Sequence, residues 1–351
     1  MNPRALLFFT SLFLASTALP ASHRFSLQSG FEYDTNVFKN FNAPQDDFLF
    51  KLVGRDVGSA NLSRTTDLYW NLQLGGKKYF ERDEQDMIIL SLEIPLRVRP
   101  SNRWMLTFTP DFKYQNESDD RDAFNADINE DFFTTSGTAA LDWALPASFQ
   151  ATFGAGLTYF HFDESVDYSY LRDAYTARLT KEWNENFQGF AQYGFAEQRF
   201  TQSPRYDREH TLTPGIRVQK YVVFTGSYTY QRLNSNNDIF SFKNHRTDLA
   251  LAIPLLHRDR SSIDSMLSLH LLGTLQFRDY PSVFGSTQEG ERFLLSGAED
   301  DNFDSLTAKL LYRPTPRWTV ESKFTRYSNS LSSANVDFER TLVYLGTRYE
   351  F

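Results

Sequence analysis

Basic side chains recur at alternate positions along this sequence, and they define the chemistry that it could carry out. Arg97, Arg99 and Arg103 flank the short segment Pro100-Ser101-Asn102. Cations that are fixed on the wall of a pore attract anions and set the selectivity of the pore. The arginine cluster therefore predicts a weak preference of such a pore for anions. Acidic residues such as Glu93 alternate in the same way, so the alternative is that acidic and basic side chains form ladders of ion pairs that stiffen the wall. The residues expected to line such a wall are Arg97, Arg99, Arg103, Lys113, Arg217, Arg278, Arg313 and Arg348.

Histidines and carboxylates give little support for catalysis or for a metal site. The six histidines are scattered, and none lies in a known nucleophile or metal motif. His161 with Asp163, or His245 with Asp248, could meet at the rim of a barrel, as in barrel hydrolases. A histidine at a strand end is more often structural. The sequence predicts a protein that is not an enzyme, with no catalytic residue and no cofactor.

Acidic residues gather in five segments that could be loops. Several carboxylates together can hold a divalent cation, but none of these segments has the D-x-D-x-D-G spacing of a calcium loop, so solvated loops without metal are expected. The chain has no cysteine, which excludes disulfides, a thiolate metal site and a lipid-modified cysteine. The acidic segments are Glu81–Asp86, Glu117–Asp122, Asp127–Asp131, Asp163–Asp167 and Glu289–Asp304.

Hydrophobic residues alternate with polar ones over most of the sequence, which indicates the elements that position these charges. Trp104, Phe108 and Phe112 share one face of an extended segment, while Thr107 and Lys113 share the other. A period of two over ten or more residues is the signal of a β-strand, and these lengths suit a tilted membrane crossing. Prolines inside the pattern, at 95, 110, 214 and 254, predict bulges or strand ends.

Sixteen such segments can be marked. Links after even-numbered segments are short and links after odd-numbered ones are usually longer and more acidic, the asymmetry of bacterial outer-membrane barrels. Gain or loss of one hairpin would give 14 or 18 strands. The expected fold is an all-β, antiparallel up-and-down transmembrane barrel. The predicted strands are 24–36, 47–57, 64–80, 86–99, 103–118, 131–145, 149–163, 170–183, 187–201, 207–219, 221–234, 244–257, 262–280, 303–314, 317–330 and 337–351.

Composition and the N-terminus agree with this architecture. A basic start and an apolar run from Ala5 to Leu19 predict a signal peptide, cleaved after Ala18 or Ala21, followed by a barrel over residues 22–351. Mean hydropathy is −0.47, as expected when lipid-facing and lumen-facing residues alternate. Aromatics form 16 % of the chain and could supply interfacial girdles. A net charge of −8 argues against nucleic-acid binding.

The last strand and the first strand carry the resemblance to known families. Residues 337–351 read D-F-E-R-T-L-V-Y-L-G-T-R-Y-E-F and resemble the closing strand of Gram-negative outer-membrane barrels, which implies that Tyr349 and Phe351 are recognised by the barrel-assembly machinery. Tyr33 to Val37 resemble the Y-D-S-N-V motif of porin-like barrels and of surface lipoprotein assembly modifiers, with Thr35 in place of serine. Ordinary turn chemistry at a strand end is the alternative for this motif.

These observations lead to an expected function. We expect a porin-like channel in the outer membrane that passes small hydrophilic solutes or ions by diffusion, with both termini in the periplasm. Expected partners are outer-membrane lipid, lipopolysaccharide and the barrel-assembly machinery, with a homo-oligomer or a protein partner left open. The alternative is a barrel that serves as a scaffold or sleeve for an exported, surface-displayed or electron-carrying protein. The assembly modifiers carry a helical repeat region before their barrel, whereas this sequence passes from the expected signal peptide directly to a strand, which disfavours an export role.

Overall fold

The computed structural model describes residues 21–37, 44–117, 132–162, 169–237, 240–257, 265–279, 284–286, 292–294, 303–329 and 338–351. The signal peptide predicted for residues 1–21 lies outside this range, apart from Ala21, and stays a prediction. The described chain is mostly β-strand, with a short 3-10 element, η1 (Asp83–Gln85), near one end of the molecule. No helix of the described residues is long and apolar enough to cross a membrane.

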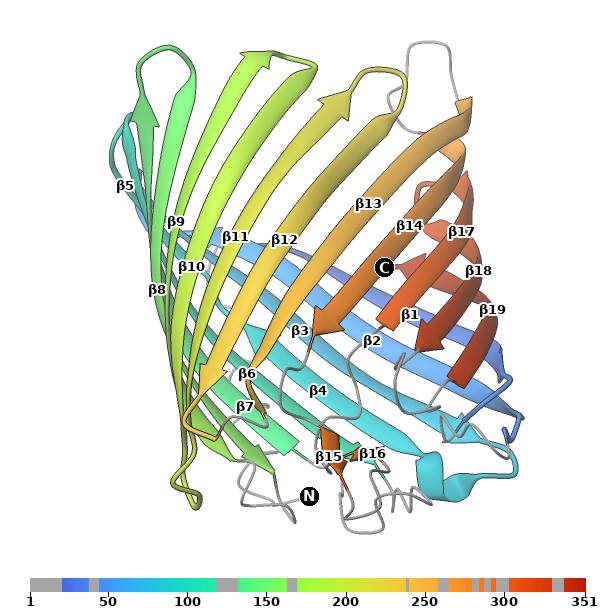
Figure 1. Ribbon diagram of the computed structural model, residues 1–351. Coiled ribbons are helices and arrows are strands. Elements are labelled where there is room, and N and C mark those ends of the chain that lie inside the picture. The colour runs from blue at the N-terminus through green and yellow to red at the C-terminus, as the bar shows by residue number, and fades with distance from the viewer. Residues whose placement is uncertain are drawn as a thin grey trace.

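Seventeen strands form one sheet (Figure 1). They are β1 (Ala21–Asp34), β2 (Asp47–Asn61), β3 (Thr66–Tyr79), β4 (Met87–Glu93), β5 (Leu96–Ser101), β6 (Trp104–Glu117), β7 (Phe132–Leu145), β8 (Phe149–Phe162), β9 (Tyr170–Asn184), β10 (Phe187–Phe200), β11 (Tyr206–Gln219), β12 (Val223–Ser235), β13 (Phe242–His257), β14 (Ser265–Asp279), β17 (Phe303–Thr315), β18 (Trp318–Asn329) and β19 (Phe338–Glu350). A separate hairpin consists of β15 (Phe284–Ser286) and β16 (Arg292–Leu294).

The sheet closes on itself as an antiparallel barrel of sixteen strands. β4 and β5 both lie between β3 and β6 and are two halves of one wall strand. β1 pairs with β2 on one side and with β19 on the other, so the first and last strands seal the barrel. The predicted count of sixteen and the predicted fold class are confirmed, and each predicted segment corresponds to one strand of the wall.

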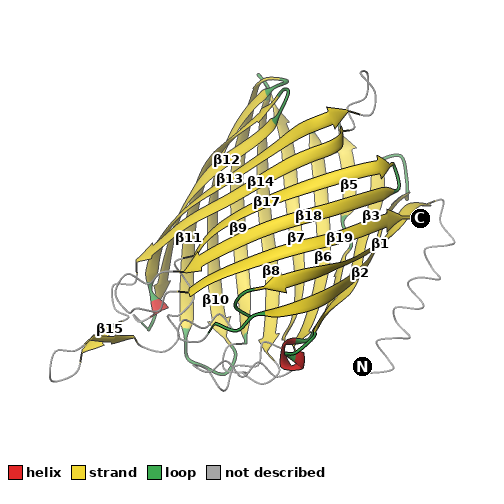
Figure 2. Ribbon diagram, turned by 90° about the vertical axis from the view of Figure 1, so that its right-hand side faces the viewer, coloured by secondary structure: helices red, strands yellow, loops and turns green. Residues whose placement is uncertain are grey.

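The two ends of the barrel differ in the length of their connections (Figure 2). Residues 62–65, 102–103, 146–148, 185–186, 220–222 and 316–317 form tight turns at one end. The other end holds most of the longer links, including the one with η1; the link between β13 and β14, residues 258–264, is the exception. In the turn between β7 and β8, Ala147 and Ser148 have φ of 57° and 59°, which matches the type I′ turn that suits a hairpin twist. The alternating link lengths predicted from the sequence are thus observed.

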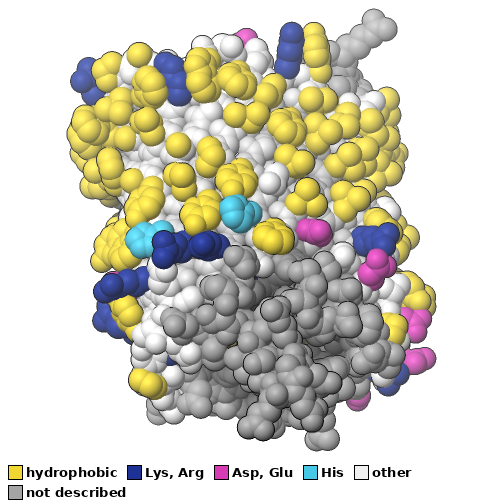
Figure 3. All heavy atoms as spheres, in the orientation of Figure 1, with side chains coloured by type: hydrophobic (Ala, Val, Ile, Leu, Met, Phe, Trp, Pro, Cys, Tyr) yellow, Lys and Arg dark blue, Asp and Glu magenta, His cyan; other side chains and the backbone are white. Residues whose placement is uncertain are grey.

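The two faces of the sheet differ in chemistry. Large apolar side chains on one face are exposed, for example Phe31 at 55 % and Leu345 at 61 %, whereas Glu32 and Tyr344 on the opposite face are 2 % and 3 % exposed. Apolar side chains cover a broad band of the outer surface (Figure 3). An exposed apolar band of this extent is typical of a surface that faces lipid. The polar halves of the strands therefore form the inside of the barrel.

Prolines interrupt the wall at two of the four predicted places. The gap between β4 and β5 falls at Pro95, and the register between β13 and β14 shifts next to Pro254. Pro214 lies among residues of β11 without bridge partners on β12, but the register is the same on both sides of it. Pro110 stays in register opposite Gly137. A proline whose missing N–H points away from a ladder bond costs little, so the bulge expected at Pro110 is absent between β6 and β7.

Candidate channel wall

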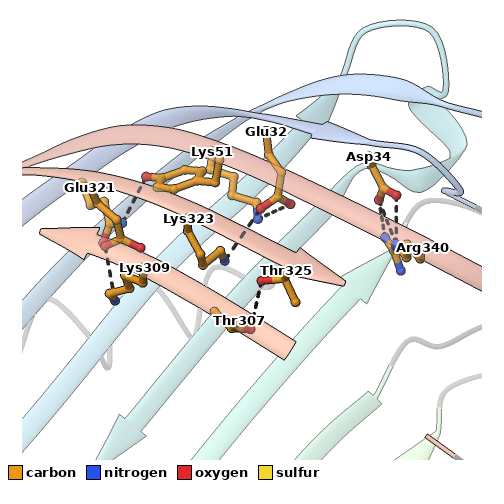
Figure 4. Close-up of polar contacts among 11 residues, drawn as sticks. Glu32, Asp34, Lys51, Thr307, Lys309, Glu321, Lys323, Thr325 and Arg340 are labelled. Atoms are coloured by element: carbon orange, nitrogen blue, oxygen red, sulfur yellow. Dashed lines mark hydrogen bonds and ion pairs between the residues drawn. The ribbon is translucent and has the colours of Figure 1, made fainter. Parts of the chain in front are cut away.

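The pairing of the strands builds continuous rows of polar residues across the inside of the barrel. Directly opposed residues in paired strands share a face and lie close enough to interact. One such row runs from β1 through β19, β18 and β17 to β14. It consists of Glu32, Tyr344, Lys323, Lys309 and His270. The row places one carboxylate beside several cationic groups that are far apart in the sequence (Figure 4).

Glu32 is the buried anion of this row. Its Oε1 lies 2.5 Å from the Nζ of Lys51, and its Oε2 lies 3.8 Å from the Nζ of Lys323. Because removing a charge from water is costly, a carboxylate that is 2 % exposed needs such partners. Lys51 is directly opposite Lys77 on β3, so a third lysine lies next to the two that pair with Glu32.

Tyr344 lies between the two lysines and against a pair of glycines. Its ring centroid is 5.7 Å from the Nζ of Lys51 and 5.5 Å from that of Lys323. Gly30 and Gly346 are directly opposed in the β1–β19 ladder. A Cβ on Gly346 would lie 2.0 Å from the Tyr344 Oη, and one on Gly30 would lie 2.6 Å from the ring. Only glycines leave room for the ring at the closing seam.

A second ion pair continues the network along β17 and β18. Lys309 lies directly opposite Lys323 in the ladder, and its Nζ is 3.4 Å from the carboxylate of Glu321. In the neighbouring row, the hydroxyl groups of Thr307 and Thr325 are 3.1 Å apart. Figure 4 shows these groups on the same face of the sheet as Glu32. This sector of the wall has more lysines than carboxylates.

The arginine cluster predicted at one turn is only partly assembled. Arg97 lies directly opposite Asp67, with its guanidinium 4.5 Å from the ring centroid of Tyr69. Arg99 forms an ion pair with Asp67 at 3.3 Å. Arg103 lies in the turn before β6 and is exposed. The structure therefore brings Arg97 and Arg99 together around one carboxylate, while Arg103 lies at the rim.

The other five predicted wall residues are spread around the barrel. Lys113 and Arg278 lie over phenylalanine rings of neighbouring strands, at 4.8 Å and 4.3 Å from the ring centroids. Arg217 donates to a glutamine side chain two residues further on at 3.0 Å. Arg348 is 3.7 Å from a glutamate carboxylate, and Arg313 is half-buried on β17. That any of these eight residues lines a conducting pore stays a prediction.

Sequence reasoning missed several charged residues on the inner face. Arg172 on β9 pairs with Glu209 on β11 at 3.2 Å, and Arg340 on β19 pairs with Asp34 on β1. The sequence did indicate the face of Arg340, because Arg340, Leu342 and Tyr344 are two residues apart and therefore lie on the same side of the strand. Some cations of the wall form ion pairs, and others, such as Lys113 and Arg178, lie over aromatic rings.

The segment that resembles Y-D-S-N-V joins the first strand to the last. Asp34 is 0 % exposed and accepts two bonds from the Nε of Arg340, at 2.9 Å and 3.0 Å, and one more from its terminal nitrogen. Thr35 and Thr341 are linked through their backbone and through the Thr35 hydroxyl. The backbone N–H of Asn36 donates to Asp34 at 3.1 Å, which is the turn chemistry considered from the sequence. The motif therefore makes a turn and also ties the closing seam.

The C-terminal aromatics lie on the apolar face next to the seam. The ring centroid of Phe351 is 5.4 Å from that of Phe25, and its N–H donates to the Phe25 carbonyl at 2.9 Å. Tyr349 packs against Trp318 with centroids 6.2 Å apart. Phe351 is 65 % exposed, so its ring remains accessible. Recognition of Tyr349 and Phe351 by the assembly machinery stays a prediction.

Where the structure describes them, the histidine and acidic candidates of the sequence are not brought together. His245 and Asp248 lie on opposite faces of β13, because an odd separation in a strand reverses the face, and the pairing considered for them is wrong. Asp248 binds Arg246 at 2.8 Å instead. Asp163, the expected partner of His161, lies outside the described residues, as do most of the acidic loops. Within the described part of the chain, no three His, Asp or Glu residues gather as a metal site.

Comparison with known proteins identifies the fold. No protein-family model and no curated protein sequence matches the chain. Solved structures match over nearly its whole length. Salmonella typhi OmpF, solved in a complex with daunomycin, has a TM-score of 0.53 at 11 % identity and covers 94 % of this chain and 97 % of its own. Pseudomonas aeruginosa OccK2, solved with glucuronate, has a TM-score of 0.51 at 9 % identity, covering 94 % and 98 %. Acinetobacter baumannii OccAB3 has a TM-score of 0.51 at 9 % identity, covering 95 % and 99 %. The chain has the fold of outer-membrane porins.

Proposed function

We propose that the protein is a porin-like channel of the outer membrane through which small hydrophilic solutes or ions diffuse. The observation that carries the proposal is the closed barrel of sixteen strands with an apolar outer face and a charged inner face. Barrels of this strand number are wide enough to leave an aqueous channel. The likeness to outer-membrane porins supports the same compartment.

The charges of the inner face support a weak preference for anions. Arg178 lies over a phenylalanine ring at 3.8 Å, and Lys113 lies over another at 4.8 Å. Arg97 and Arg99 are two cations beside the single carboxylate of Asp67, so this part of the wall has an excess of positive charge. Cations on a wall raise the local concentration of anions. The ion pairs elsewhere on the wall limit this preference, since each neutralises one cation.

A porin-like channel would have a defined orientation in the outer membrane. Short turns face the periplasm in bacterial barrels and longer links face outward. Both termini would then lie in the periplasm, beside the end with tight turns. Tyr349 and Phe351 would be presented to the barrel-assembly machinery from that side, and lipopolysaccharide would surround the half of the barrel nearer the long links.

Conductance in planar lipid bilayers tests the proposed function. The purified, folded protein should insert and give stable open steps, whereas the same preparation unfolded by heat should give none. A folded barrel that inserts without any conductance would contradict the diffusion channel. That outcome would favour the alternative, a scaffold or sleeve for an exported, surface-displayed or electron-carrying partner that fills the barrel.

A further inference from the structure

A row of aromatic side chains crosses the inner face of the barrel at the end with long links. Phe160 on β8, Tyr170 on β9 and Phe200 on β10 are directly opposed in the register of three neighbouring strands (Figure 1). The row continues with Thr134 on β7, which is opposite Phe160, and with Lys113 on β6, which is opposite Thr134. All five side chains are half-buried. They lie on the face of the sheet opposite to the exposed apolar side chains of the same strands.

Three rings of this region form a near-parallel stack. The ring centroids of Phe132, on β7, and Phe160 are 4.8 Å apart, with 25° between the ring planes. The centroids of Phe160 and Tyr170 are 5.1 Å apart, with 13° between the planes. Phe200 is tilted by 57° from Tyr170 and ends the stack. Rings that are nearly parallel at these separations cover one another's faces, so their edges are directed to the lumen. The edge of an aromatic ring carries the positive part of its quadrupole.

A cation lies at each end of the aromatic row, and the two cations differ in their partners. Arg205, in the link between β10 and β11, lies over the ring of Phe200 at 4.4 Å. It donates to both carboxylate oxygens of Asp207 at 2.7 to 3.1 Å, so its charge is neutralised. At the other end, the Nζ of Lys113 lies 4.8 Å from the ring centroid of Phe132.

Neutral groups are directly opposite Lys113 on both sides. They are Ser91 on β4 and Thr134 on β7. Asp111 shares the inner face two residues earlier on β6, and its carboxylate accepts a hydrogen bond from the hydroxyl of Ser136 at 2.8 Å. Among the described residues, Lys113 forms no ion pair. A cationic group and a stack of positively polarised ring edges therefore lie side by side on the inner face.

We propose that Lys113 and the stacked rings of Phe132, Phe160 and Tyr170 form a binding site for small aromatic carboxylates. The inference rests on the proposed function, because a solute must enter the lumen to reach this face. The carboxylate of the solute pairs with Lys113 in a charge-assisted hydrogen bond. The ring of the solute places its electron-rich face over the edges of the stacked rings, in the edge-to-face arrangement that aromatic pairs favour. A neutral sugar packs its C–H groups on the negative face of an aromatic ring, and these faces are covered here, so the geometry favours the aromatic acid.

Titration of the folded protein in detergent with benzoate, followed by NMR of the ligand, tests the site. Cyclohexanecarboxylate has the same charge and a similar size but no aromatic ring, so it should bind about fivefold more weakly than benzoate. Lys113→Gln keeps all the rings and should weaken the binding of both carboxylates about fivefold. Phe160→Leu keeps the charge, so it should weaken the binding of benzoate and leave that of cyclohexanecarboxylate unchanged.

The outer face of the barrel offers a matched control. The Nζ of Lys181 on β9 lies 4.4 Å from the ring centroid of Phe149 on β8, which is the same arrangement of a cation over a phenylalanine. Lys181 is an odd number of residues from Tyr170 on the same strand, so it lies on the opposite face. Lys181→Gln and Phe149→Leu should bind benzoate as the unchanged protein does. All variants should keep the same heat-dependent migration in gels, which shows that the barrel is folded.

Four results would overturn the site. The unchanged protein binds benzoate no better than cyclohexanecarboxylate; Lys113→Gln or Phe160→Leu binds benzoate as before; the controls on the outer face lose as much binding; or glucose binds in place of benzoate and is lost in Phe160→Leu. Conductance of the same samples separates this inference from the channel itself. Open channels without ring-dependent binding of benzoate contradict only the site. Silent barrels with the expected differences in binding contradict only the channel.

Discussion

Replacing Arg340 with methionine is expected to weaken the seam between the first and last strands of the barrel. The guanidinium of Arg340 makes three hydrogen bonds to the carboxylate of Asp34, which is fully buried. Methionine has a similar length and keeps the apolar contacts of the arginine stem, but it leaves Asp34 with only the N–H of Asn36 among these partners. A buried carboxylate would then lack its countercharge.

The size of the effect follows from burial. Removing one partner of a buried ion pair costs about 3–5 kcal/mol of folding free energy, because the remaining charge is uncompensated. The retained bond from Asn36 places the expected loss near the lower limit, at about 3 kcal/mol. Arg326 offers a matched control in the neighbouring strand β18. It pairs with Glu339 at 2.7 Å, but the two side chains are 54 % and 68 % exposed, so Arg326→Met should cost less than about 1 kcal/mol.

Equilibrium unfolding in urea, in lipid vesicles or detergent, measures these differences through the linear dependence of free energy on denaturant. The variants are Arg340→Met, Asp34→Asn and their combination, which form a double-mutant cycle. The combined variant should lose less than the sum of the two single variants, because it no longer buries an unpaired charge. A loss for Arg340→Met no greater than for Arg326→Met, or a coupling energy near zero, would refute the assignment of the seam to this pair.

Three further changes test other parts of the wall. Gly346→Ala should destabilise the barrel by about 2 kcal/mol or more, since its Cβ would lie 2.0 Å from the Tyr344 Oη. The control is Gly273→Ala, where the nearest atom would be 4.0 Å away. It should change the free energy of unfolding by less than about 0.5 kcal/mol in the same urea assay. Arg97→Gln should move the reversal potential in a salt gradient toward cation preference, and an unchanged or opposite shift would contradict a role in selectivity. Deletion of Phe351 should lower the yield of folded barrel in the outer membrane, whereas Phe351→Tyr, which keeps a terminal aromatic ring, should give the yield of the unchanged protein. Equal yields for the deletion and the unchanged protein would show that the terminal ring is not the assembly signal.

Local pattern was sufficient to predict the strands and the closed barrel, but it did not indicate which side chains of distant segments meet. The alternation from Trp104 to Tyr114 depends only on neighbours along the chain, and it predicts β6 and its two faces correctly. The bidentate pair of Asp34 and Arg340 joins residues 306 positions apart, and no feature within either segment indicates the other. The pairing considered for His245 was wrong for a local reason, because it ignored the face on which each side chain of β13 lies.

Alternation also leaves the closing register undetermined, and the seam residues resolve it. A slip of two residues between β1 and β19 would keep every side chain on its present face, because the period of a strand is two. In hairpins the turn fixes the register, but no turn joins the first strand to the last. A two-residue slip would separate Gly30 from Gly346 and place a side chain under the ring of Tyr344. The same slip would move Arg340 away from Asp34. The glycine pair and the buried ion pair therefore select one closure among several that satisfy the hydrophobic pattern equally, which gives the Y-D-T-N-V segment a physical role in forming the barrel.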